Sequence, residues 1–282
     1  MKLKIIYILI FTLLVASKAQ SVFAQNIDDC MHQADSFIQN NNSQAAYTLY
    51  DRIWHFASNK EKQDISQNYL TSAFKTERFS SSLNILQFLK NQTDTEIGSD
   101  QKLMEVAAHF NLENWDECMQ VIDEYATDSI DGLQANLSYF SLLCALKTNQ
   151  NERMQTSINQ LKKYASESKQ KSLDSLYQAY QQTQFVLPNK AKILSLLVPG
   201  LGQVYQKEYS QAANAFTLNA LLIGASILTA HFYNWPQAAL FWAFYVPHYY
   251  FGNARSARDM AHQKNTKIEE ERYLGFKNWE LN

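Results

Sequence analysis

The stretch Ser195-Leu-Leu-Val-Pro-Gly-Leu-Gly-Gln-Val-Tyr205 decides the fold of this 282-residue chain. A turn of the form Pro-Gly-x-Gly-Gln-x-Tyr interrupts a short apolar segment, and no Lys, Arg, Asp or Glu follows from Tyr209 to Ala254. About 20 apolar residues in a helix cross the hydrocarbon core of a bilayer. The stretch therefore predicts a membrane unit that the chain enters through a sharp corner.

The charge-free run is long enough for two transmembrane helices, at about 211–232 and about 236–252. The aromatic residues between them suit the headgroup layer. We expect a membrane domain over residues 185–265 and a polar tail over 266–282. The segment 193–198 is too short to span a bilayer and is expected to lie in its interface. A buried hairpin in a soluble domain is the alternative, which the absence of charge disfavours.

The corner itself has a structural interpretation. Pro199 ends the preceding helix, while Gly200 and Gly202 permit positive φ and close approach of the backbone. Gln203 can satisfy backbone groups freed at the membrane edge, and Tyr205 suits the interface. A nucleotide-binding loop is not expected, because no strand precedes the glycines and no third glycine follows at the required spacing.

Four polar residues lie on or near the predicted spans. Asn214 and Asn219 belong to the first span, and His248 and Asn253 to the second. Polar side chains within a span usually face another helix, so we expect interhelical contacts from these four residues. A transport or proton path is the alternative.

The corner motif, followed by an Ala-rich helix and Tyr249-Tyr-Phe-Gly-Asn253, resembles a small bacterial two-helix membrane domain. That domain carries a Pro-Gly-x-Gly-Gln-x-Tyr signature, is usually classed as of unknown function, and is similar to two-transmembrane domain proteins. The resemblance covers residues 189–265. Lys207 stands where this family often has Gly, and Ala212 replaces another common Gly. The resemblance implies a membrane hairpin and no known reaction.

Residues 25–184 are expected to form about four antiparallel helix pairs. Polar turns open at positions that are 36 residues apart, namely Gln39, Lys75, Asn111 and Lys147 (75 − 39 and so on). Apolar residues recur at helical spacing on both sides of each turn. One such pair cannot bury its apolar face alone, so the pairs must stack. The pattern resembles the tetratricopeptide class, whose usual period is about 34 residues.

Small residues recur within the helix pairs, as close helix packing requires. The first helices align Ser36, Ser72, Ala108 and Cys144. The chain has three cysteines, at positions 30, 118 and 144. An odd number without close spacing supports neither a disulfide framework nor a zinc site, so we interpret them as small apolar helix residues.

Residues 1–24 have the pattern of a secretory signal peptide, with Lys2 and Lys4 before an apolar core. Cleavage is expected after Ala24, with Ala19 as a second candidate and an uncleaved anchor as the alternative. Export and the positive-inside rule place the base of the hairpin, where Lys190 and Arg255 lie, on opposite sides of the membrane. Export favours an outer base and a cytoplasmic tip, whereas the rule favours the reverse. The orientation stays open.

No catalytic constellation, cofactor motif or metal-ligand spacing is present, so we do not expect an enzyme. A net charge of −2 without a basic stripe gives no reason to expect a nucleic-acid partner. The predicted fold is all-α: tetratricopeptide-like helix-pair repeats followed by a transmembrane hairpin.

The predicted protein is a scaffold of the bacterial cytoplasmic (inner) membrane, with its repeats in the periplasm. Its repeat surface would bind a protein partner at the envelope, and the hairpin would contact the lipid bilayer and could form homo-oligomers. The alternative is a subunit of a small oligomeric transporter or channel, with Asn214, Asn219 and His248 lining the path.

Overall fold

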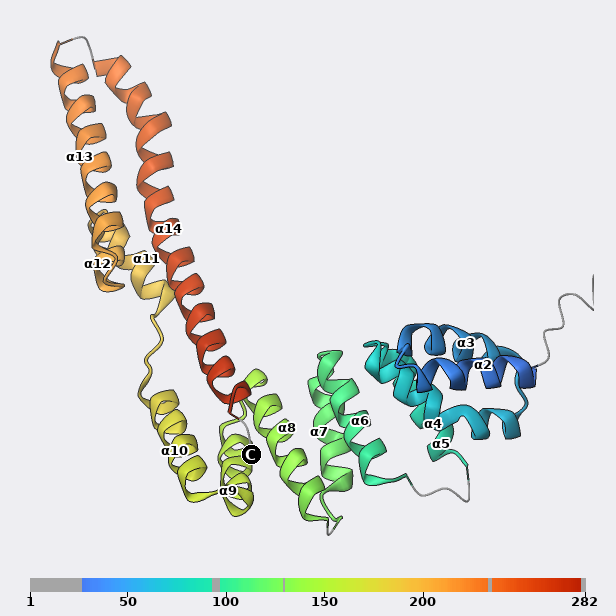
Figure 1. Ribbon diagram of the computed structural model, residues 1–282. Helices are drawn as coiled ribbons and strands as arrows, with labels where there is room; N and C mark the ends of the chain where they lie inside the picture. The colour runs from blue at the N-terminus through green and yellow to red at the C-terminus, as the bar shows by residue number, and fades with distance from the viewer. Residues whose placement is uncertain (1–26, 93–96, 129, 233–234, 280–282) are drawn as a thin grey trace, which may run out of the picture. The chain divides into compact units, whose positions relative to one another are not determined.

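The computed structural model describes residues 27–92, 97–128, 130–232 and 235–279 (Figure 1). Every regular element within these residues is an α-helix, which confirms the all-α class. The chain divides into two compact units, one up to Tyr164 and one from Ala165. The predicted signal peptide, residues 1–24, lies outside the described residues.

The first unit contains eight described helices, each packed against the next along the chain. They are α2 (Ile27–Gln39), α3 (Ser43–Phe56), α4 (Asn59–Lys75), α5 (Phe79–Lys90), α6 (Ser99–Asn111), α7 (Trp115–Tyr125), α8 (Asp131–Lys147) and α9 (Asn151–Tyr164). Two clusters of buried apolar residues, one including Leu70 and the other Ile122, form its core. The helices therefore stack side by side, as the amphipathic pattern requires.

The turns within the pairs repeat with the predicted step of 36 residues. A residue with left-handed φ occurs at Asn41 (55°), Glu77 (59°), Glu113 (59°) and Asn149 (55°) (77 − 41 and so on). After each one, an amide donates to the carbonyl five residues earlier, as Asn42 does to Phe37 at 2.8 Å. This is a helix C-terminal turn in which a left-handed residue closes the last carbonyls. The backbone thus follows the repeat seen in the sequence.

Small residues fill the contacts between successive pairs. Cys118 of α7 and Cys144 of α8 occupy one such contact and are 26 residues apart. The equivalent positions of the two earlier contacts hold Ala46 and Ser72, then Ser82 and Ala108. All six residues are fully buried.

The second unit is built around its last helix. Its helices are α10 (Glu167–Gln182), α11 (Pro188–Leu197), α12 (Leu201–Tyr205), α13 (Tyr209–Phe232) and α14 (Trp235–Lys277). The 43 residues of α14 make a helix of about 64 Å. The other four helices all contact α14, and Figure 1 shows α13 running beside it as an antiparallel partner.

Only α13, among the described residues, is long and apolar enough to cross a membrane. The second predicted span, 236–252, is the first part of α14, which does not meet the same criterion and continues through Pro247 to Lys277. Much of the predicted polar tail, 266–282, is therefore helical. The compact units also divide earlier than the predicted boundary at 184/185, since α10 belongs with α14.

Candidate functional site

The distribution of side chains on α13 is the reverse of that on a helix of a water-soluble protein, with large apolar residues exposed and small or polar residues buried. Its buried side chains are Ala212, Asn219 and Ser226, which are small or polar and recur every seven residues. Large apolar residues such as Phe216 and Leu221 are exposed. Small residues between helices and large apolar residues outside are typical of helices packed in lipid. The exposed face of α13 is therefore a candidate membrane-contacting surface.

The same reversal begins already in α11. Ala191 and Ser195 are fully buried, whereas Ile193 is 57% exposed and Leu197 is 69% exposed. Val204 in α12 is exposed as well. The apolar surface thus extends from α13 over α11 and α12, which are too short to span a bilayer.

The two motif glycines are required for different reasons. Gly200 has a left-handed φ of 93°, and a Cβ atom there would lie 2.5 Å from the carbonyl oxygen of Ala212. Gly202 lies in α12, and its Cβ would lie 2.0 Å from the carbonyl oxygen of Ala191. Gly200 therefore lets the chain turn against α13, whereas Gly202 lets α12 pack against α11. Pro199 occupies the turn between α11 and α12.

A chain of hydrogen bonds, buried at the motif and partly buried at α14, joins the motif to α11 and α14. The Gly202 amide donates to Ser195 Oγ at 3.0 Å, and Ser195 Oγ donates to Gln203 Oε1 at 2.9 Å. Gln203 Nε2 then donates to Asn253 Oδ1 at 2.7 Å. Buried polar networks of this kind fix one arrangement of helices, because a broken member leaves the others unsatisfied.

A second set of hydrogen bonds holds the C-terminal end of α12 to α14. Gln206 Nε2 donates to the carbonyl of Ala257 at 2.7 Å and to that of Gly202 at 3.1 Å. Lys264 Nζ donates to the carbonyl of Gln206 at 2.7 Å and lies 3.6 Å from Glu208. Gln206 is almost fully buried. The corner is thus held to α14 at both of its ends.

Aromatic residues complete the corner. Lys190 Nζ lies 4.9 Å from the centre of the Tyr205 ring, a cation–π contact, and Tyr205 packs against the alanines at the α11–α14 contact. The hydroxyl of Tyr250 donates to the carbonyl of Leu196 at 2.6 Å, near the end of α11. Sequence reasoning missed Tyr250, Ser195 and Gln206, because all three lie outside the Pro-Gly-x-Gly-Gln-x-Tyr motif.

The four polar residues predicted on the spans occupy different environments. Asn253 joins the motif network through Gln203. Asn219 is 5% exposed, but its amide donates to the carbonyl of Ala215 in its own helix. Asn214 and His248 are exposed. The structure therefore brings one of the four, Asn253, to the corner motif.

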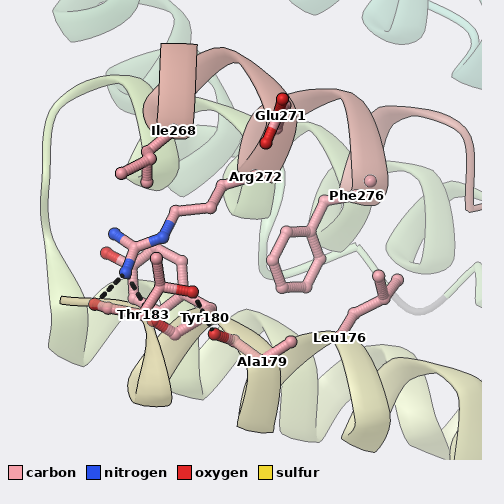
Figure 2. Close-up of a pocket in the computed structure, with 9 residues that line it drawn as sticks. Leu176, Ala179, Tyr180, Thr183, Ile268, Glu271, Arg272 and Phe276 are labelled. Atoms are coloured by element: carbon pink, nitrogen blue, oxygen red, sulfur yellow. Dashed lines mark hydrogen bonds between the residues drawn. The ribbon is translucent and has the colours of Figure 1, made fainter. Parts of the chain in front are cut away.

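A clamp fastens α10 to the far half of α14, beyond the corner (Figure 2). Arg272 Nη2 donates to the carbonyls of Tyr180 and Thr183, each at 2.7 Å, at the C-terminal end of α10. Its guanidinium carbon lies 4.4 Å from the centre of the Tyr180 ring and 4.6 Å from the centre of the Phe185 ring. A cation at this end of a helix also interacts favourably with the helix dipole.

A cavity of about 210 Å³ lies beside this clamp. Figure 2 shows Leu176, Ile268 and Phe276 on its walls, together with the Arg272 side chain. Earlier in α14, the side-chain amide of Asn265 accepts from the backbone N–H of Val186 at 2.9 Å and donates to its C=O at 2.8 Å. The cavity thus lies at the contact between the end of α10 and α14.

Metal ligands do not gather in the part of the chain that the structure describes: no group of three or more His, Cys, Asp or Glu side chains there could hold an ion. In comparisons with known proteins, no family model, curated protein or solved structure matches this chain.

Proposed function

We propose that this protein is an exported, membrane-anchored scaffold whose helix-pair repeats bind a protein partner at the bacterial envelope. One observation carries the proposal: a stack of recurring helix pairs is followed at once by a unit whose exposed surface is apolar from α11 to α13. Stacked repeats present extended surfaces suited to protein partners, and the reversed surface suits lipid. Transmembrane insertion of α13 with the first part of α14 belongs to this proposal.

The contacts of α10 support one orientation. Two residues, Ala165 and Ser166, separate α9 from α10, and so short a connection cannot cross a bilayer. The end of α10 is bonded to Arg272, and Trp279 Nε1 donates to the carbonyl of Lys169 near its start. The repeats, the corner and the last part of α14 therefore share one side of the membrane in this proposal.

Export of the repeats then gives the hairpin an outer base and a cytoplasmic tip. This orientation exposes Lys190, Lys207 and Arg255 on the outer side, against the positive-inside rule. The conflict makes orientation the first part of the proposal to test.

Cysteine accessibility tests the orientation. In a chain with its native cysteines replaced by alanine, single probes are introduced by Thr156→Cys in the repeats, Trp235→Cys at the far end of the hairpin and Lys277→Cys at the end of α14. We expect an impermeant maleimide to label the first and third probes in intact spheroplasts, and the second only after lysis. Opposite labelling of the Thr156 and Lys277 probes would contradict the shared side.

Photo-crosslinking tests the partner surface. The repeat places Thr48, Asn84, Gln120 and Thr156 at equivalent, exposed positions of α3, α5, α7 and α9. A photoreactive residue at each position should capture the same protein from membranes at neighbouring repeats, because a partner bound along the stack contacts more than one pair. Probes at His32 and Asn68, which are exposed on α2 and α4, test whether the partner instead contacts the first helix of each pair. Capture by neither set would count against a repeat-binding partner.

A second candidate function rests on the exposure of Asn214 and His248. Polar side chains in an apolar span are stabilised by contact with another helix, which a second copy of the hairpin could supply. The protein would then be a subunit of an oligomeric transporter or channel. Asn214→Leu with His248→Leu should abolish oligomers seen by crosslinking in membranes. Unchanged oligomers, or a monomeric wild type, would exclude this function.

A further inference from the structure

Two buried thiols of the repeat unit touch each other. The sulfur atoms of Cys118 and Cys144 are 3.4 Å apart, and both residues are fully buried. The Cys144 thiol donates to Cys118 Sγ, and the Cys118 thiol donates to the carbonyl of Val106 at 3.5 Å. A disulfide bond is about 2.05 Å long, so each sulfur would have to move by roughly 0.7 Å to form one.

The repeat register explains why these two residues meet. The equivalent positions at the two earlier contacts hold Ala46 with Ser72 and Ser82 with Ala108. Small side chains at such positions let neighbouring helices approach closely. Cysteine meets this size requirement, and here it occupies both sides of one contact. A disulfide at this place would join α7 to α8 without introducing a larger side chain.

We propose that Cys118 and Cys144 form a disulfide bond between α7 and α8 in the exported protein. The proposal rests on the export proposed above, because disulfides form and persist outside the reducing cytosol. Cys30, which lies in α2, takes no part in the bond. The bond closes a loop that includes the connection between the two helices and so restricts the unfolded chain.

The oxidant in this proposal is a disulfide-bearing thiol oxidase of the envelope. The thiolate of one cysteine attacks a sulfur of the oxidase disulfide, which gives a mixed disulfide and releases one oxidase thiolate. The thiolate of the second cysteine attacks the cysteine sulfur of the mixed disulfide, and the second oxidase thiolate leaves. Two electrons pass to the oxidase, and the two protons from the cysteines end on its thiols.

The timing of the reaction follows from burial. The neighbouring Cys144 thiol and the burial of the site raise the pKa of the Cys118 thiol. The thiolate is the reactive form, so exchange is slow once α7 and α8 have packed. Oxidation therefore takes place while the exported repeats fold.

The test uses the full chain expressed with its N-terminal segment and precipitated with acid to trap its thiols. Thiols are blocked with a small maleimide, disulfides are reduced, and the new thiols are coupled to a polyethylene-glycol maleimide. We expect two additions per chain in the wild type and in the matched control Cys30→Ser. Cys118→Ser and Cys144→Ser should each give none. The oxidised wild type should also melt about 5–10 °C higher in detergent than the reduced form, with no such difference in Cys118→Ser.

Two further measurements separate this proposal from the proposed export. Protease digestion of the repeats in spheroplasts reports export directly. Digested repeats without reduction-dependent labelling would overturn the disulfide and leave the export intact. Undigested repeats would overturn the export, and the pair would then be decided by the purified full chain refolded in a glutathione redox buffer. A Cys118–Cys144 linked peptide in its mass spectrum supports the pair, and its absence or a pairing with Cys30 overturns it.

Discussion

The two units of this protein use the same backbone turn but bury different kinds of side chain around it. In the repeats, left-handed residues such as Glu77 close a helix, and the next amide reaches back five residues. The corner before α13 does the same: Lys207 has a φ of 64°, and the Glu208 amide donates to the carbonyl of Gln203 at 2.9 Å. Around this shared turn, the repeats bury large apolar residues, while α11, α12 and α13 of the second unit bury small and polar ones. The turn therefore depends on local backbone geometry alone, whereas the kind of side chain that is buried differs between the two units.

The largest expected effect concerns the close packing of the second unit. Gly202→Val would place a branched side chain where a single Cβ already lies 2.0 Å from a backbone oxygen. We expect a loss of about 4 kcal/mol or more, since neither backbone can yield cheaply. Thermal unfolding of the purified protein in detergent measures it. Gly224→Ala, in open space on α13, is the control and should not destabilise the protein, because alanine favours a helix more than glycine does. Equal behaviour of both variants would refute the packing argument.

Matched leucine truncations test the reversal directly. Leu142 is fully buried in the repeats, whereas Leu221 on α13 is 66% exposed. Leu142→Ala should cost about 3 kcal/mol through lost burial and a cavity. Leu221→Ala should lower the free energy of unfolding by less than about 0.5 kcal/mol in detergent, because the Leu221 side chain is already exposed in the folded protein. Denaturant or thermal unfolding compares the two, and similar losses would break the contrast.

Alkaline pH should weaken the repeats through their tyrosines. Burial raises the pKa of Tyr50, Tyr69 and Tyr125 well above 10, and each hydroxyl donates to a carboxylate, those of Asp35, Asp51 and Glu105. A raised folded pKa means that the unfolded state loses its proton first, so this stability is present below about pH 10 and is lost as pH rises further. Circular dichroism against pH should show a loss of up to about 1.4 kcal/mol per pH unit for each tyrosine.

The control for the alkaline titration is Tyr125→Phe. Its stability should fall less steeply above pH 10, because one titrating group is gone while Glu105 keeps its ion pair with Lys90 at 2.9 Å. An unchanged slope in this variant would show that the Tyr125 hydroxyl does not contribute.

The smallest effect tests the shared turn. Lys207→Gly and Glu77→Gly each remove a side chain from a left-handed residue, which should stabilise either unit by about 1 kcal/mol. Melting temperatures of the two single variants measure this gain. A stabilised Glu77→Gly beside a destabilised Lys207→Gly would show that the corner depends on the Lys207 side chain, for which the turn geometry gives no reason.

Much of the fold could be predicted because it is encoded locally. The 36-residue step and the breaks at Pro199 and Gly200 are visible without a partner. The clamp on α14 could not be read in this way, since the partners of Asn265 and Arg272 lie 79 to 92 residues away. Residues 266–277 were therefore predicted as a polar tail. In the structure they are the last part of α14, which packs against α10.

The candidate site was predicted only as far as its motif. Gln203 was expected to satisfy backbone groups freed at the membrane edge, whereas its side chain pairs with those of Ser195 and Asn253. The contact of Cys118 with Cys144 was missed, although a signal existed: the repeat alignment places both at small-residue positions. Combining the alignment with the packing of neighbouring pairs would have brought the two thiols together.

The dominance of α14 has a consequence for biosynthesis. Val186, Gln203, Gln206 and the end of α10 all find their partners on this last helix. While the ribosome is still making residues 250–277, α10 to α13 lack the groups that hold them in place. The repeat unit contains its own partners and can fold as it emerges. The second unit must wait, so a chain that stalls before Asn253 would carry finished repeats and an unassembled second unit.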